Sequence, residues 1–122
     1  MAYADCFVLP VPVKKLPAYK ALAKKASKIW MEHGALEYRE CVGEDLGIAK
    51  QMKCVPFMKL AKAKSSETVM VSWIVYKNRA HRDRVNAKVM NDPRTAAMCD
   101  PKNLPFDMKR MACGGFSVLV EG

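Results

Sequence analysis

The chain of 122 residues is short and basic, with 51% hydrophobic residues and a formal net charge of +9 at pH 7. Its length suits one domain with one core, and its apolar fraction excludes an intrinsically disordered chain. No apolar stretch approaches the roughly 20 residues that span a bilayer, and the first residues lack the pattern of a signal peptide, so we expect a cytoplasmic protein without membrane contact.

The five cysteines occur without a CxxC pair and without the spacing of a zinc finger. An odd number of thiols in this arrangement is typical of reduced cysteines that pack as small apolar residues. We therefore expect no disulfide and no metal site. We also expect no cofactor, because Gly114-Gly115 lacks the further glycines or the GKS or GKT sequence of a phosphate-binding loop.

The first third of the chain is predicted to form a strand, a helix and a second strand. Residues 3–11 contain a run of apolar residues that ends at prolines, which predicts a strand. Over residues 14–33, apolar side chains recur every three or four positions, as in an amphipathic helix, and Gly34 is suited to end it. Residues 35–44 alternate between apolar and polar side chains, which predicts a half-exposed edge strand.

The segment of residues 45–66 gives no clear pattern, apart from a helical turn near residues 57–63. Residues 68–76 follow it and are rich in β-branched and aromatic side chains that are apolar at both alternating positions. This composition predicts a strand with two apolar faces.

The last third of the chain is predicted to contain two helices and one strand. Asn78 can cap a helix over residues 79–90, and Asp92-Pro93 is suited to start a second, short helix. Residues 111–120 are predicted to form the last strand.

The order of these elements predicts an α+β fold, the ferredoxin-like βαββαβ arrangement. Right-handed connections place the first and third strands at the centre of a four-stranded antiparallel sheet, with the helices on one face. Because the central strands are apolar on both faces, the face without helices would expose a large apolar patch. We therefore expect a homodimer in which a second copy covers that face.

Short motifs along nearly the whole chain resemble those of one family. They are Tyr3-x-Asp5-x-Phe7-Val8, Gly34-Ala35-Leu36 with Glu40, Ser72-Trp73-Ile74-Val75-Tyr76, His81-Arg82-Asp83, Asp92-Pro93-Arg94, Pro105-Phe106-Asp107-Met108-Lys109-Arg110-Met111 and Gly114-Gly115-Phe116. Together they resemble the YbaA-like family of small bacterial proteins of unknown function. Leu104 stands where a methionine is usual, and Cys113 where an aromatic residue is usual. The resemblance implies a dimeric α/β barrel and no established substrate.

Charged side chains gather around the predicted short helix and before the last strand. We predict a ligand site there, because arginine binds carboxylate or phosphate groups in a bidentate manner. Two aromatic residues are expected to form apolar walls of the same pocket, between the sheet and the helices. An ion-pair network that fixes the loop before the last strand is the alternative interpretation of the charged residues. The predicted ligand-binding residues are Trp73, Asp92, Arg94, Asp107, Lys109, Arg110 and Phe116.

His81 and Asp107 are the candidate acid–base residues. A helix rises ~1.5 Å per residue, so His81 lies roughly 16 Å from Asp92 and cannot belong to the same charged group. The alternative for His81 is a solvent-exposed side chain. His33, at the end of the first helix, is expected to interact with the terminal carbonyl groups of that helix.

Three functions remain open from the sequence. The first is binding of a small molecule, anionic if the arginines hold it, between the sheet and the helices. The second, from the resemblance to dimeric α/β barrels, is a cofactor-independent oxygenase or lyase activity. The third is RNA binding, which the net charge favours and the absence of an aromatic RNP motif opposes. The solvated basic face of the first helix is the alternative explanation of the charge.

Overall fold

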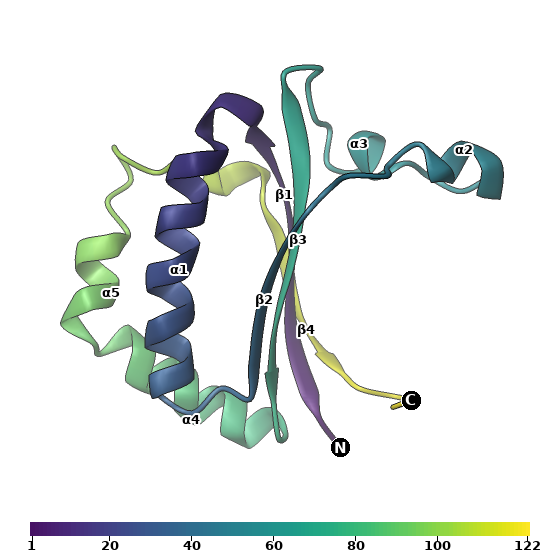
Figure 1. The fold of residues 1–122 in the computed structure, drawn as a ribbon. Coiled ribbons are helices and arrows are strands. Elements are labelled where there is room, and N and C mark those ends of the chain that lie inside the picture. Colours follow the sequence, from purple (N-terminus) through teal and green to yellow (C-terminus); the bar gives the residue numbers. More distant parts are fainter.

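The computed structural model describes residues 1–122 and confirms the ferredoxin-like fold (Figure 1). Strands β1 (Tyr3–Pro12), β2 (Glu37–Val42), β3 (Glu67–Tyr76) and β4 (Ala112–Ser117) form one sheet. The strand order is β2-β3-β1-β4, and every pair of neighbours is antiparallel. The two strands predicted to be central, β1 and β3, are therefore central.

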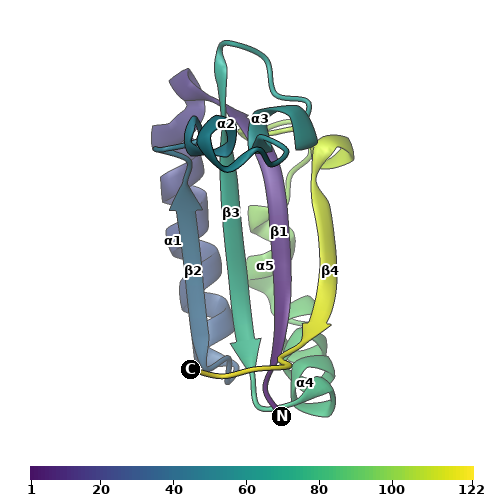
Figure 2. The ribbon, with the colours of Figure 1, turned by 90° about the vertical axis from the view of Figure 1, so that its right-hand side faces the viewer.

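The longer helices cover one face of the sheet (Figure 1). After the short 3-10 helix η1 (Val13–Lys15), helix α1 (Leu16–Glu32) runs along the strands. Helix α4 (Arg79–Met90) lies at the end of the sheet where β3 finishes, and α5 (Pro93–Met98) turns back beside α1 (Figures 1 and 2). The helical layer thus consists of α1, α4 and α5.

Side-chain caps fix where α4 and α5 begin. The Asn78 side chain accepts a hydrogen bond from the backbone N–H of His81, at 2.8 Å. The Asp92 side chain accepts one from the backbone N–H of Arg94, at 2.9 Å. Each cap satisfies a backbone donor that has no partner inside the helix, so both predicted starts are confirmed.

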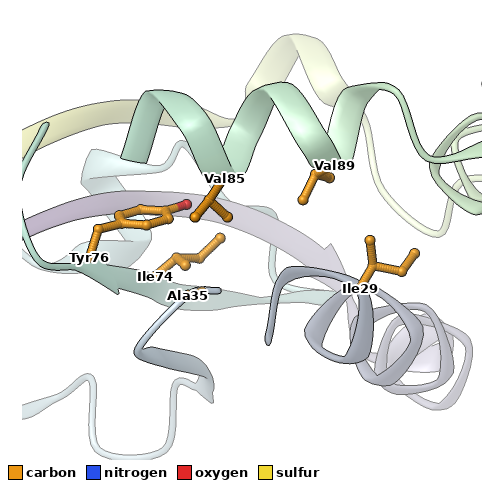
Figure 3. Close-up of a cluster of buried hydrophobic side chains, with 6 residues drawn as sticks. All are labelled: Ile29, Ala35, Ile74, Tyr76, Val85 and Val89. Atoms are coloured by element: carbon orange, nitrogen blue, oxygen red, sulfur yellow. The ribbon is translucent and has the colours of Figure 1, made fainter. Parts of the chain in front are cut away.

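The core between helices and sheet consists of two clusters of buried apolar side chains. One joins the end of β3 to α1 and α4, and Figure 3 shows its six members: Ile29, Ala35, Ile74, Tyr76, Val85 and Val89. The other joins β1 and β3 to the start of α1 through Leu9, Val11, Tyr19 and Met70. Full burial of one such large side chain contributes about 1.5 to 3 kcal/mol to the free energy of unfolding.

Strand β1 continues through two prolines. Its pairing with β4 ends at Val8, opposite Ala112, whereas its pairing with β3 continues to Pro12. Pro10 and Pro12 therefore lie where one side of the strand has no partner, and there a missing N–H removes no ladder bond.

The connection between β2 and β3 lies on the opposite side of the sheet from α1 (Figures 1 and 2). It contains α2 (Ile48–Met52), which the sequence pattern did not predict, and α3 (Phe57–Leu60), within the predicted helical turn. The 3-10 helix η2 (Met108–Arg110) precedes β4, and β4 ends at Ser117, earlier than expected. None of the helices combines the length and the apolar composition needed to cross a membrane.

Candidate functional site

A cavity of about 810 Å³ lies between the sheet and the helical layer. Its lining is mostly apolar and comes from all four strands, from α1 and α4, and from the segment between α5 and β4. This volume is in the range of pockets that bind small molecules. The lining residues Cys113, Gly114 and Gly115 belong to the edge strand β4 and are exposed.

Strand alternation selects the side chains that form the cavity floor. Successive residues of a strand point to opposite faces, so Asp5, Phe7 and Leu9 of β1 share the face that the helices cover. Ser72 and Ile74 of β3 point the same way. The residues between them point to the other face, which is called the outer face below.

One polar group in the cavity is centred on Asp5 and Arg82. Arg82 Nε lies 3.4 Å from Asp5 Oδ1, and Arg82 Nη2 donates a hydrogen bond of 2.9 Å to the hydroxyl of Tyr3. The Tyr3 hydrogen bond and the negative charge of Asp5 hold the pKa of Arg82 above its ordinary value. The buried Nε atom of Arg82 has no hydrogen-bond partner. Arg82 also lies 3.2 Å from the exposed carboxylate of Asp83.

Asn86 extends this polar group toward α1. Its amide nitrogen lies 3.5 Å from Asp5 Oδ2, and its carbonyl oxygen accepts hydrogen bonds of 3.2 Å from Trp30 Nε1 and from the Tyr76 hydroxyl. Burial, followed by the charge of Asp5, raises the pKa of Tyr76. The Tyr76 hydroxyl therefore stays protonated and acts as a donor.

Gly115 leaves room for the same polar group. A Cβ atom at this position would meet the hydroxyl of Tyr3 and, at 2.7 Å, Arg82 Nη2. The second glycine of the Gly114-Gly115 pair is thus required by a close approach of side chains.

A second polar group consists of Tyr19, Tyr38 and Glu40. The Tyr19 hydroxyl donates to Glu40 Oε1 and the Tyr38 hydroxyl to Glu40 Oε2, both at 2.8 Å. Burial, followed by the charge of Glu40, raises the pKa of both tyrosines. Both hydroxyls are therefore fixed as donors to the carboxylate.

Two of the predicted ligand-binding residues, Trp73 and Phe116, lie on the outer face. Trp73 donates a hydrogen bond of 3.0 Å from Nε1 to Glu37 Oε2, and Phe116 is 58% exposed. Neither residue lines the cavity. The strand alternation that brings Ser72 and Ile74 into the cavity points Trp73 away from it.

Asp92 and Arg94 form an ion-pair network with the end of α1. Arg94 Nη2 lies 2.8 Å from Asp92 Oδ2 and 2.7 Å from Glu32 Oε2. His33 Nε2 lies 2.8 Å from Asp92 Oδ2, so the expectation that His33 interacts with carbonyl groups is corrected. Hydrogen bonds from Arg94 and His33 hold the pKa of Asp92 well below its usual range.

Asp107, Lys109 and Arg110 lie elsewhere. Asp107 accepts a hydrogen bond of 2.9 Å from the backbone N–H of Lys109, whose side chain is exposed. Arg110 pairs with Glu67 at the start of β3. The network around Asp92 contacts Glu32 and His33 at the end of α1, close to the start of β2, which pairs with the end of β3. The structure therefore does not bring the predicted charged group together, because α4 crosses the end of the sheet.

The candidate acid–base residues His81 and Asp107 do not line the cavity. The Nδ1 atom of His81 lies 3.0 Å from the backbone N of Lys77, and its ring packs edge-on against Tyr76 with 5.9 Å between centroids. The observed environment of His81 is a set of local contacts at the start of α4.

Comparison with known proteins places the chain in a family. A family model described as a protein of unknown function (DUF1428) matches residues 2–108. The chain belongs to the DUF1428 family. It is 39% identical over 121 residues to the uncharacterized protein YbaA of Escherichia coli K12, and the match covers 99% of both chains. The uncharacterized protein YbaA of Shigella flexneri matches to the same extent. The YbaA-like resemblance inferred from the motifs is thus confirmed.

One solved structure of similar fold is an uncharacterized NIPSNAP domain protein from Burkholderia xenovorans. Its TM-score is 0.62 at 15% identity, over 95% of this chain and 93% of that chain. This likeness supports the fold assignment and carries no information on activity.

The cavity of this DUF1428 protein contains polar residues that the sequence patterns did not single out as a site. Asp5 and Arg82 belong to the quoted family motifs, which was the available signal. Tyr19, Tyr38 and Glu40 occupy the apolar positions of an amphipathic helix and an alternating strand, where they are indistinguishable from core residues. Only the antiparallel register brings the two groups into one cavity.

Proposed function

We propose that this DUF1428 protein binds a small, largely apolar molecule in the cavity between the sheet and the helices. The observation that carries the proposal is a cavity of about 810 Å³ whose apolar lining is interrupted by two separate polar groups. Apolar walls supply binding free energy through burial, and a few polar groups orient the ligand. The polar groups are Asp5–Arg82–Asn86 and Tyr19–Glu40–Tyr38.

The charges of the cavity lining give limited support to an anionic ligand. The ionised lining residues are the carboxylates of Asp5 and Glu40 and the guanidinium of Arg82. Arg82 already lies near two carboxylates of its own chain. An acidic ligand would therefore compete with Asp5 for Arg82 and would approach Glu40 against its charge.

An oxygenase or lyase activity would need a base inside the cavity. Asp5 and Glu40 are the only carboxylates that line it, and no histidine does. Tyr19, Tyr38 and Tyr76 keep their protons, as their raised pKa values indicate. Binding without chemistry is therefore the simpler proposal, and any catalytic step would depend on these two carboxylates.

A cavity-filling variant tests the binding proposal. Ala26 of α1 lines the cavity, whereas Ala21 on the same helix is exposed. We expect a thermal-shift screen of amphipathic molecules with one or two rings to give ligands that raise the melting temperature. Ala26→Phe should weaken their binding at least about tenfold, and Ala21→Phe should leave it unchanged. Equal binding by both folded variants, or no stabilising molecule at all, would contradict the proposal.

We further propose that the protein is a homodimer and that a second copy covers the outer face. The outer face carries apolar side chains of the central strands, and exposed apolar residues border it at both ends. Figure 2 shows α2 and α3 in front of one end of the sheet and the C-terminal segment in front of the other. The exposed border residues are Ile48, Met52, Val55, Phe57, Leu60, Leu119 and Val120. A second copy related by a two-fold axis would bury both borders at once.

A further inference from the structure

Glu40 is the one charged residue of the cavity lining without an ionic partner. Asp5 and Arg82 lie within ion-pair distance of each other, whereas Glu40 takes part in none of the ion pairs of the structure. Both of its oxygens accept hydrogen bonds from tyrosine hydroxyls, which is the arrangement of an ionised carboxylate. The neutral hydroxyls stabilise the carboxylate but do not cancel its charge.

Two aromatic rings bond to this carboxylate through their hydroxyls, and two more rings lie beside those two within the cavity. The Tyr19 ring packs edge-on against Phe106, with 5.7 Å between centroids, and the Tyr38 ring lies 6.3 Å from Trp30. All four rings line the same cavity as Glu40. Faces of Trp, Tyr and Phe rings attract organic cations, and the attraction strengthens where water is excluded.

The chain itself places no cation in this part of the cavity. Lys20 and Lys24 line an adjoining groove of about 460 Å³ between α1 and β2, which shares Glu40 and its two tyrosines with the cavity. Neither lysine forms an ion pair with Glu40 within 4.0 Å. Both lysine side chains are exposed on the surface of α1. A partly buried carboxylate among aromatic rings is stabilised most by a cation that enters with an apolar ligand.

We infer that the ligand of this cavity carries a protonated amine on an apolar body, with Glu40 as its counter-ion and the aromatic rings around it. This inference rests on the proposed function, because it assigns a chemical class to the molecule that the cavity binds. It also reverses the charge expected from the arginines outside the cavity.

Three probes of matched shape test the inference by isothermal titration calorimetry at neutral pH. They are 4-phenylbutylamine, 4-phenylbutanol and 4-phenylbutyrate, which differ in the charge of one end group. We expect the amine to bind at least about tenfold more tightly than the alcohol, and the acid to bind most weakly. This ranking is measured on the wild-type chain, so it does not depend on the folding of any variant.

Glu40→Gln and Glu37→Gln form a matched pair of variants on the same strand. Glu37 points to the outer face, where it is bonded to Arg39 and Trp73. Glu40→Gln should abolish the preference for the amine and retain the affinity for the alcohol, whereas Glu37→Gln should retain the preference. Binding of the alcohol or the acid as tightly as the amine would overturn the inference and leave the proposed function standing. Binding of none of the three probes would overturn both.

Discussion

The guanidinium group of Arg110 binds both carboxylate oxygens of Glu67. Nη1 lies 2.7 Å from Oε2 and Nη2 lies 2.8 Å from Oε1, and Nη2 also donates to the carbonyl of Lys62 at 2.9 Å. The Glu67 side chain is 5% exposed. This pair links the turn before β4 to the start of β3. An ion pair that fixes the loop before the last strand was the predicted alternative to ligand binding.

Arg110→Ala is expected to destabilise the protein. The substitution would leave the buried Glu67 carboxylate without its cation, so we expect the melting temperature to fall by about 5 °C or more. Lys109→Ala is the matched control, because the neighbouring Lys109 side chain is exposed and should change the melting temperature little. Differential scanning calorimetry of the wild type and the two variants measures these melting temperatures. Equal melting temperatures of the two variants would show that Arg110 does not stabilise the fold.

Stability in acid should depend on Glu67. Hydrogen bonds from Arg110 and from the backbone N–H of Lys64 lower the pKa of Glu67 from 4.5 to about 2. Because the folded state has the lower pKa, the stabilisation is complete above about pH 4.5 and is lost as the pH falls toward 2. Urea unfolding of Glu67→Gln should therefore depend less steeply on pH in this window than that of the wild type. Parallel pH profiles would show that the pair contributes no acid sensitivity.

Gly115→Ala is expected to disturb the polar group around Arg82. The added methyl group would meet the Tyr3 hydroxyl and Arg82 Nη2, so one of these side chains must move, at a cost of about 1 to 3 kcal/mol. At Gly114 the nearest atom to a new Cβ is 3.7 Å away in Phe116, which is ordinary contact. Gly114→Ala should therefore keep nearly the parent's free energy of unfolding in urea titrations. A larger loss in Gly114→Ala than in Gly115→Ala would contradict this geometry.

A charged residue on the outer face should separate the proposed dimer. Val71 lies at the centre of β3 on the outer face, opposite Val8 and Cys41 in the sheet. We expect light scattering to give twice the mass of 13.7 kDa for the wild type and the monomer mass for Val71→Lys. Ala21→Lys on the exposed face of α1 should remain dimeric. A wild-type protein that is monomeric at micromolar concentration would rule the dimer out.

Most of the fold followed from patterns that are local in the sequence. The apolar repeat predicted α1, the Asn78 and Asp92 caps fixed two helix starts, and the β-branched run predicted β3. Helix α2 escaped prediction because its N-cap, Gly47, makes no side-chain capping bond and the helix has only five residues. Short helices without caps leave little trace in a sequence.

The candidate site was less predictable because it depends on the register of distant strands. Asp5 and Arg82 meet only because α4 packs on the face of the sheet to which Asp5 of β1 points. Trp73 shows the difficulty most clearly, because β3 is apolar on both faces. Nothing in the pattern of such a strand determines which face a given side chain occupies.

The two tryptophans of the chain lie on opposite sides of the sheet. Trp30 lines the cavity, and Trp73 is on the outer face beside Glu37. Replacing either tryptophan by phenylalanine therefore leaves one tryptophan, and its fluorescence reports on one side of the sheet only. Emission from Trp73→Phe would follow cavity occupancy, and emission from Trp30→Phe would follow coverage of the outer face. The sheet thus separates two optical signals, so that ligand binding can be followed in one single-tryptophan variant and self-association in the other.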